Sequence, residues 1–185
     1  MKRALIVIDY TVDFVADEGK LTCGEPGQVI QGKIAGLMRE FAEAGDYVVV
    51  ANDIHFEGDE FHPEARLFPP HNIAWTEGRE LYGAVRTAYD DVKASGAPIP
   101  ILEFDKTRYS AFAGTELDLR LRERGIREIH LVGVCTDICV LHTAVDGYNL
   151  GYSMVVYREA VASFNQAGHE WALEHFKHTL GADVR

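Results

Sequence analysis

The chain has 185 residues, of which 47% are hydrophobic and 25% charged, and its net charge is −11. This apolar content excludes a disordered chain, and the sequence has no run of about 18 apolar residues that could cross a membrane. Acidic residues outnumber basic ones by 29 to 18, so nucleic acid and anionic membrane surfaces would repel the protein. We therefore expect a single compact domain over residues 1–185, without a nucleic-acid or membrane partner.

The amino-terminal segment predicts a strand rather than a secretion signal. Its apolar run, residues 4–8, is five residues long and ends at Asp9, which is too short for the hydrophobic region of a signal peptide. The three cysteines, Cys23, Cys135 and Cys139, are too few for a disulfide scaffold, and their odd number is typical of a reducing compartment. We therefore expect a cytoplasmic protein.

Apolar runs alternate with helical periodicities along the chain. In chain order we expect a strand at 5–8, a helix at 29–41, a strand at 47–51, an irregular segment at 52–76, a helix at 79–89, a strand at 99–104, a helix at 116–124, a strand at 129–134, a helix at 137–150, a strand at 154–157, a helix at 166–180 and a short strand near 182–184. This alternation predicts a three-layer αβα fold of the α/β class, with a mostly parallel sheet of five or six strands.

Polar residues follow the carboxyl ends of four predicted strands. Asp9 follows the first strand, residues 53–55 follow the second, Asp105 and Lys106 follow the third, and the turn at 135–139 follows the fourth. In open α/β sheets the ligand crevice lies outside the carboxyl ends of the strands. We therefore expect these side chains to meet in one site.

Cys139, Lys106 and Asp9 form the candidate catalytic group. A free thiol is only slightly ionised at neutral pH, whereas the thiolate is the nucleophile. We expect Cys139 in the first turn of a helix, where the helix dipole and the Lys106 ammonium both favour the thiolate, with Asp9 holding the lysine and moving a proton. Backbone N–H groups of the segment 133–139 could stabilise an oxyanion.

Each cysteine also has an interpretation that does not involve this catalytic group. Cys139 could be a small buried hydrophobic residue. Cys135 and Cys139 could form a redox pair, although their spacing is C-x3-C rather than C-x2-C. Cys23 has no partner pattern, and we expect it to be incidental.

Histidines and carboxylates of the long irregular segment form a candidate metal site. Asp53 and His55 alternate, so their side chains point to one side of an extended segment, and Glu64 and His71 lie further along the same loop. Two histidines with carboxylates suit one divalent ion, for which we expect zinc, with iron or manganese as alternatives. A structural role for each single histidine stays open, and His62 receives no assignment.

At these residues the sequence resembles the nicotinamidase branch of the isochorismatase-like cysteine hydrolases, over nearly the whole chain. The matching segments are 8–15, 53–55, 61–64, 67–71, 105–112 and 133–140. The last segment, Gly-Val-Cys-Thr-Asp-Ile-Cys-Val, is typical of the superfamily. The Asp-x-His pair with a later histidine is typical of nicotinamidases.

The resemblance implies the isochorismatase-like hydrolase fold and a nicotinamidase that produces nicotinate and ammonia through a cysteine thioester, in NAD salvage. Its implied site residues are the triad Asp9, Lys106 and Cys139, the oxyanion-hole amides of Cys135 and Cys139 beside a cis peptide between Val134 and Cys135, the metal ligands Asp53, His55 and His71 with Glu64 bound directly or through water, and the aromatic pocket residues Phe14, Phe68 and Tyr109. The family also suggests a homo-oligomer, either a dimer or a tetramer. Relatives often carry an aliphatic or small residue at position 135, so Cys135 adds a thiol that can be oxidised near the nucleophile.

Three other functions remain open. A related cysteine hydrolase could act on another small amide or a ureido compound. A zinc hydrolase could use a metal-bound hydroxide as its nucleophile, and Cys139 would then be dispensable. A non-catalytic flavodoxin-like module would carry a phosphate-binding glycine loop, but neither G-x-G-x-x-G nor G-x4-G-K-[ST] occurs in the sequence.

Overall fold

The computed structural model describes residues 2–96 and 101–185, and within them six parallel strands form one sheet in the order β3-β2-β1-β4-β5-β6. The strands are β1 (Arg3–Ile8), β2 (Tyr47–Asp53), β3 (Leu102–Lys106), β4 (Glu128–Val134), β5 (Ser153–Ala162) and β6 (Asp183–Val184). The predicted parallel sheet of five or six strands is therefore confirmed. All seven residues of β2 are buried, which explains its continuous apolar sequence.

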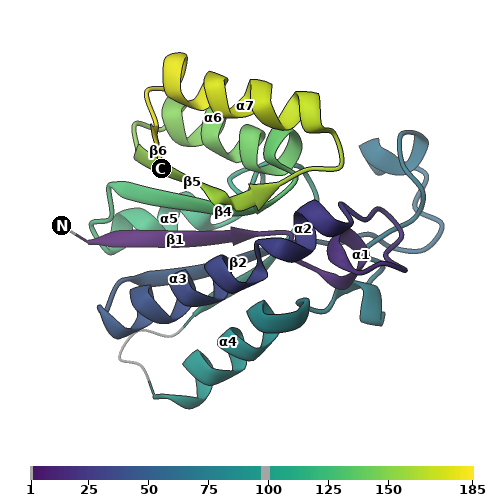
Figure 1. Cartoon of the computed structure of the whole chain (residues 1–185), viewed down its shortest axis with the longest axis horizontal. Coiled ribbons are helices and arrows are strands. Elements are labelled where there is room, and N and C mark those ends of the chain that lie inside the picture. Colours follow the sequence, from purple (N-terminus) through teal and green to yellow (C-terminus); the bar gives the residue numbers. More distant parts are fainter. Residues whose placement is uncertain (1, 97–100) are drawn as a thin grey trace.

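Helices cover both faces of the sheet (Figure 1). One layer contains α3 (Gln31–Glu43) and α4 (Gly83–Ala94), and the other contains α5 (Leu117–Glu123), α6 (Leu141–Asn149) and α7 (Gln166–His178). Alternate residues of β1 enter the two cores: Leu5 and Val7 pack under α3 and α4, whereas Ile6 and Ile8 pack under the opposite layer. The central strand is thus buried on both sides.

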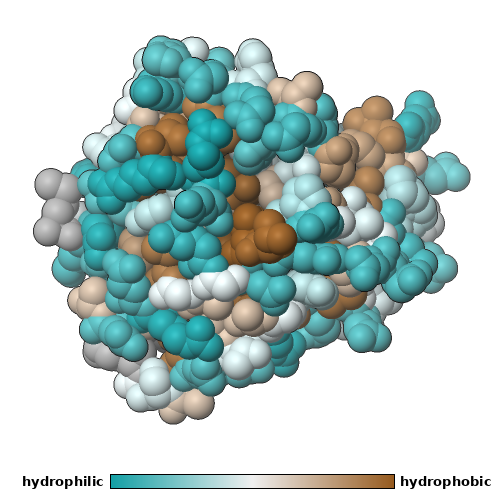
Figure 2. Space-filling view, in the orientation of Figure 1, coloured by the Kyte–Doolittle hydropathy of each residue, from teal (hydrophilic) through white to brown (hydrophobic). Residues whose placement is uncertain are grey.

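The short elements lie beyond the carboxyl ends of the strands. They are α1 (Val12–Val15), α2 (Glu25–Val29), the 3-10 turns η1 (Pro63–Arg66) and η2 (Glu77–Arg79), and the π-helical turn η3 (Thr136–Val140). The segment between β2 and α4 projects from this end of the molecule, and hydrophobic side chains gather on its surface (Figures 1 and 2). Its exposed members include Phe61 and Trp75, which are 97% and 93% exposed. The projecting part of this segment therefore contributes a surface, whereas Leu81 at its end packs in the core beneath α3 and α4.

Several element boundaries differ from the prediction. Asp105 and Lys106 are the last residues of β3 instead of following it, and residues 99 and 100 of the predicted strand lie outside the described part of the chain. β5 continues to Ala162 because its exposed middle residues, Arg158 and Glu159, only interrupt the apolar pattern. The helix predicted from residue 137 begins as the π-helical turn η3. Within residues 2–96 and 101–185, no helix combines the length and the apolar character needed to cross a bilayer.

Candidate active site

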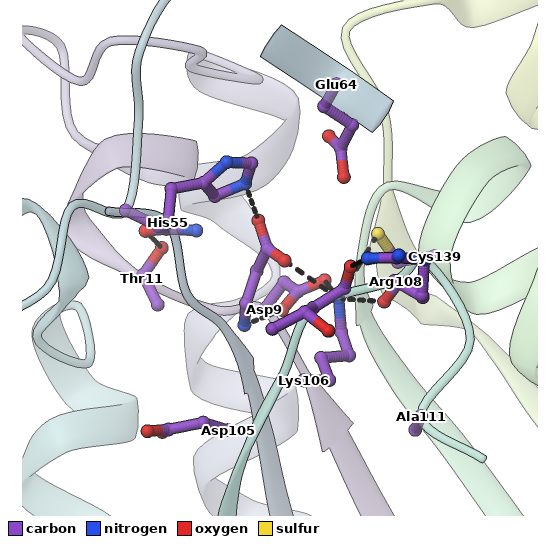
Figure 3. Close-up of polar contacts among 12 residues, drawn as sticks. Asp9, Thr11, His55, Glu64, Asp105, Lys106, Arg108, Ala111 and Cys139 are labelled. Carbon is purple, nitrogen blue, oxygen red and sulfur yellow. Dashed lines mark hydrogen bonds and ion pairs between the residues drawn. The ribbon is translucent and has the colours of Figure 1, made fainter. Parts of the chain in front are cut away.

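Three strands bring Asp9, Lys106 and Cys139 together. Asp9 directly follows β1, Lys106 ends β3, and Cys139 lies in η3, just after β4. The Lys106 Nζ atom lies 2.7 Å from Asp9 Oδ2 and donates a hydrogen bond to Cys139 Sγ at 3.7 Å. All three residues are buried, and Figure 3 shows their side chains pointing toward one another. The predicted catalytic group therefore exists as a compact cluster, assembled from residues far apart in the sequence.

Burial dominates the electrostatics of this cluster. Burial raises the pKa of the Cys139 thiol well above its ordinary value, although the Lys106 ammonium acts in the opposite direction. Lys106 therefore acts on the thiol in the expected direction, but burial, which the sequence did not indicate, outweighs it. Burial also raises the pKa of Asp9, against the opposing effect of Lys106. A neutral thiol thus lies beside a carboxyl group of raised basicity that could accept its proton.

Asp53 connects this cluster to the histidines of the neighbouring loop. Its backbone N–H donates to Asp9 Oδ1 at 2.7 Å, and its side chain lies 2.6 Å from His55 Nε2. Burial alone would raise the pKa of Asp53, but the Lys106 ammonium and the nearby imidazoles of His55 and His71 hold it well below its usual range. The Asp53 carboxylate is therefore ionised between the lysine and the imidazoles.

The predicted metal ligands lie close together. His71 Nε2 is 3.5 Å from Asp53 Oδ2 and 3.7 Å from Glu64 Oε2, and Glu64 reaches the site from η1 (Figure 3). Asp53, His55, Glu64 and His71 are all buried. Within the described residues, Asp53 Oδ1 and His71 Nε2 are buried without a hydrogen-bond partner. Because buried polar atoms are almost always paired, these orphaned oxygen and nitrogen atoms fit a divalent ion.

His62 is a further potential ligand that sequence reasoning did not identify. One potential ligand atom from each of Asp53, His55, His62 and Glu64 lies within 4.8 Å of the other three. The His62 Nε2 atom is also buried and has no hydrogen-bond partner in the described part of the chain. The available signal was the segment Phe61–Glu64, where His62 precedes Glu64 by two residues. In an irregular loop, however, this spacing does not determine the direction of a side chain.

Asn72 supports the loop that carries the histidines. Its backbone adopts a left-handed conformation with φ of 46°, and its carbonyl accepts a hydrogen bond from the His55 N–H. Its own N–H donates to Asp13 Oδ2 at 2.8 Å, and its side-chain oxygen accepts from the Thr11 hydroxyl. This fully buried residue therefore fixes the backbone beside both His55 and His71.

Arg79 supports the backbone of Asp53, whereas Asp105 lies outside the site. The Arg79 Nε atom donates to the Asp53 carbonyl at 3.0 Å, and its guanidinium forms an ion pair with Asp105. The Asp105 side chain is half-exposed and lies apart from the other site residues (Figure 3). Of the two residues expected to follow the third strand, only Lys106 enters the site, because successive side chains of a strand point to opposite faces.

The turn after β4 depends on a close approach between two strands. A Cβ atom at Gly133 would lie 2.0 Å from the Ile8 carbonyl oxygen, so only glycine fits there. The peptide bond between Val134 and Cys135 is cis, as the resemblance implied. The Cys135 carbonyl then accepts hydrogen bonds from the N–H groups of Ile138 and Val140, on either side of Cys139.

The start of α7 anchors this turn. The Ser163 hydroxyl donates to Asp137 Oδ1 at 2.6 Å, and the Asn165 amide donates to Asp137 Oδ2. Thr136 Oγ1 lies 2.8 Å from His169 Nδ1. A Cβ atom at Gly168 would lie 1.9 Å from Asp137 Oδ2, so η3 and α7 are in close contact.

Two cavities flank Glu64. One, of about 430 Å³, is lined by His55, Phe68 and His71, and the other, of about 450 Å³, is lined by Tyr109 and His142. Phe14 lines neither of these two cavities, and the centroid of its ring lies 5.1 Å from the centroid of the His71 ring. The three aromatic residues implied by the resemblance therefore surround the site without lining one common cavity. Burial, reinforced by Glu64, raises the pKa of Tyr109 to about 12 and keeps its phenol neutral.

The fold and this cluster define an α/β protein of the isochorismatase class. The model of the Isochorismatase domain matches residues 3–185, and the chain belongs to this family. It is 62% identical over 184 residues to the uncharacterized isochorismatase family protein PncA of Bacillus subtilis, covering 100% of this chain and 99% of that protein.

Solved structures agree with this assignment. The crystal structure of nicotinamidase/pyrazinamidase PncA from Bacillus subtilis superimposes with a TM-score of 0.94 at 59% identity, covering 100% of this chain and 99% of that one. The pyrazinamidase of Pyrococcus horikoshii in complex with zinc gives a TM-score of 0.83 at 28% identity, covering 100% of this chain and 99% of that one. The predicted isochorismatase-like hydrolase fold is therefore confirmed.

Proposed function

We propose that the protein is an amidohydrolase that converts nicotinamide to nicotinate and ammonia through a thioester on Cys139. The observation that carries this proposal is the buried contact of Lys106 with both Asp9 and Cys139, beside the Asp53 and His55 pair. The nicotinamidase names of close relatives support the choice of substrate. A thiol, a proton acceptor and a fixed cation are the groups that nucleophilic attack on a carboxamide requires.

Asp9 and Lys106 prepare the nucleophile. Because burial keeps the Cys139 thiol neutral, Asp9 accepts its proton as the sulfur attacks the carboxamide carbon. The Lys106 ammonium, 3.7 Å from the sulfur, stabilises the developing thiolate. A carbon–sulfur bond forms, and the carbonyl oxygen becomes an oxyanion.

The backbone N–H groups of Cys135 and Cys139 stabilise this oxyanion. Each well-aimed donor lowers such a barrier by roughly 3–4 kcal/mol. Asp9 then returns the proton to the leaving nitrogen, and ammonia departs as the carbon–nitrogen bond breaks. In the second half of the reaction Asp9 accepts a proton from water, whose oxygen attacks the thioester carbon. The carbon–sulfur bond breaks, Asp9 returns the proton to the Cys139 sulfur, and the carboxylic acid is released and ionises to nicotinate.

Asp53, His55 and His71, with Glu64 directly or through water, would hold one divalent ion. We propose zinc, with iron or manganese as alternatives, because two imidazoles and carboxylates accept all three. An ion bound there would supply a Lewis acid that attracts the lone pair of a ring nitrogen. Phe14, Phe68 and Tyr109 would contact the flat ring and orient its carboxamide toward Cys139.

The remaining proposals concern the whole molecule. We propose that residues 1–185 form a single domain that works in the cytoplasm in NAD salvage and assembles as a dimer or tetramer. Three buried cysteines that stay free thiols support a reducing compartment. Sedimentation velocity of the purified protein tests the assembly, and a monomer at micromolar concentration would contradict it.

Ammonia release from nicotinamide tests the catalytic proposal. We expect Cys139→Ala to lower kcat by roughly 10³-fold or more, because the covalent route is lost. An N-carbamoyl compound of similar size serves as the comparison substrate and should be hydrolysed far more slowly. Full activity of Cys139→Ala, or a preference for the ureido substrate, would refute the proposal.

A further inference from the structure

Besides Cys139, two further thiols lie beside the site and have no role in the proposed reaction. The Sγ atoms of Cys23 and Cys135 are 3.5 Å apart, and both residues are buried and form no disulfide. The sequence shows no partner pattern for Cys23, whereas the structure places its sulfur against that of Cys135. The two residues are 112 positions apart in the sequence, so spacing alone does not indicate the contact.

We propose that Cys23 and Cys135 form a reversible disulfide when a peroxide oxidises the protein, and that this bond lowers the hydrolase activity. A disulfide requires an S–S distance of about 2.05 Å, so the sulfur atoms must approach by about 1.5 Å. The bond itself is independent of the proposed function, whereas its effect on activity rests on that function.

The packing separates this pair from the nucleophile. Cys23 and Cys135 belong to the core beneath α3 and α4, whereas Cys139 belongs to the core on the opposite face of the sheet. The Cys139 sulfur is engaged with Lys106 rather than with either of these cysteines. Cys23 is therefore the thiol that the geometry offers to Cys135, in place of the C-x3-C pair considered from the sequence.

The loop that carries Cys23 can supply the required movement. Cys23 lies between α1 and α2, and its N–H donates to the Phe14 carbonyl at 2.8 Å. Its neighbours Thr22 and Gly24 are partly exposed, so the loop lies at the surface while the Cys23 side chain points inward. Cys135, in contrast, is held between β4 and η3. Movement of this loop would therefore supply most of the shortening of the distance between the two sulfur atoms. A smaller displacement of Cys135 would supply the rest.

The oxidation is a balanced two-electron reaction. One sulfur attacks an oxygen of hydrogen peroxide, the O–O bond breaks, and a sulfenic acid and one water are formed. The second thiol then attacks that sulfur and displaces the hydroxyl group as a second water, which forms the S–S bond. The two thiols are oxidised to one disulfide, and the peroxide is reduced to two waters.

The expected loss of activity follows from the position of Cys135. Its N–H is a proposed oxyanion donor, and its carbonyl accepts from the N–H groups of Ile138 and Val140 around Cys139. A shift of Cys135 toward Cys23 moves this donor relative to the nucleophile. Because an oxyanion donor acts mainly in the transition state, kcat should fall more than KM rises.

Peptide mapping tests the bond without reference to activity. Trypsin places Cys23 in the peptide 21–33 but leaves Cys135 and Cys139 together in the peptide 128–158. The Cys139→Ala variant, treated with hydrogen peroxide and then alkylated, therefore allows a clear assignment. We expect a linked pair of these peptides that disappears after dithiothreitol and is absent from Cys23→Ala/Cys139→Ala. A protein in which both cysteines remain alkylatable would overturn the proposal.

Activity measurements test the consequence. Cys23→Ala and Cys23→Ser should keep the basal activity, because the Cys23 side chain contacts the Cys135 thiol, which has no role in the proposed reaction. At a peroxide dose that links most of the wild-type protein, we expect kcat to fall by about 10-fold or more and to recover with dithiothreitol. The Cys23 variants should lose less than about half of their activity. Equal losses in all three proteins, or a linked wild type that stays fully active, would refute the effect on catalysis. If the reduced wild type does not hydrolyse nicotinamide, the proposed function fails, while the mapping result still decides the bond.

Discussion

The two halves of the site are built in different ways. The triad is fixed by the sheet, because Asp9, Lys106 and Cys139 lie at or just beyond the ends of three strands. Most of the metal cluster is instead carried by the irregular segment between β2 and α4, and only Asp53 belongs to a strand. A side chain at a strand end has its direction set by the sheet, whereas a loop side chain depends on local hydrogen bonds such as those of Asn72. The triad should therefore be the rigid half, and the metal cluster the half that depends on its supporting residues.

The largest expected effect on stability and activity comes from removing the positive charge of Lys106 from the triad. Lys106→Met leaves the Asp9 carboxylate buried without its cation, which should destabilise the protein by about 3–5 kcal/mol. Nicotinamide hydrolysis should fall by roughly 10³-fold. Urea unfolding and ammonia release measure the two effects, with Lys177→Met on the exposed face of α7 as the control.

A second substitution separates charge from packing. Asp9→Asn/Lys106→Met removes both buried charges, so it should recover much of the lost stability while remaining inactive. If the double variant is no more stable than Lys106→Met, then lost packing rather than an unpaired carboxylate explains the destabilisation.

The next largest effect is expected from losing the metal ion of the cluster between β2 and α4. Chelation should abolish most of the hydrolysis while far-ultraviolet circular dichroism stays unchanged, because the site lies outside both hydrophobic cores. His71→Ala should weaken zinc binding by more than about 10²-fold, since a ligand matters more than an outer-shell partner. Metal content and zinc titration provide the measurement, with His142→Ala on the rim of the second cavity as the control.

His62→Ala decides between the two candidate histidines. We expect a smaller loss of zinc affinity than for His71→Ala, because the His71 Nε2 atom faces both Asp53 and Glu64. The opposite order would replace His71 by His62 in the ligand set, which the arrangement of Asp53, His55, His62 and Glu64 also permits.

The same division explains what the sequence could predict. The strands and the meeting of Asp9, Lys106 and Cys139 follow from local apolar patterns and from the topology of parallel sheets. The direction of His62 and the contact of Cys23 with Cys135 depend on loop conformation, which no periodicity encodes.

The ionisation of Cys139 could not be predicted for a related reason. The sequence indicates the neighbouring lysine and the start of a helical turn, and both favour a thiolate. The dominant effect is burial, which depends on how residues far apart in the sequence pack around Cys139 in the folded protein. Asp9 gains its proposed role as proton acceptor from that same burial.

A smaller effect is expected from the residues that support the loop. Asn72→Ala should weaken zinc binding by about 10–100-fold, because the Thr11 hydroxyl loses its acceptor and alanine is strained at the left-handed φ of the backbone that bonds His55. Asn72→Gly should be less affected, since glycine accepts the left-handed φ of 46° without strain. Thr11→Val, which removes only the hydroxyl donor, should have the mildest effect. Unchanged zinc affinity in all three variants would show that the loop holds its ligands without this support.

The smallest effect tests whether a strand also fixes a polar side chain outside the site. His130 of β4 is buried between Glu128 and the Tyr157 hydroxyl, each 2.9 Å from one ring nitrogen. Burial lowers its pKa despite Glu128, while Arg3 and Arg185 act in the same direction as burial.

Below about pH 6.5 the unfolded chain therefore binds a proton that the folded protein refuses, so the free energy of unfolding falls as the pH decreases. The slope from His130 is at most about 1.4 kcal/mol per pH unit. This dependence of the free energy of unfolding on pH should be absent from His130→Gln and retained in Tyr157→Phe when both are unfolded in urea with chelator present. An identical pH dependence in wild type and His130→Gln would mean that the strand does not hold this imidazole in its neutral form.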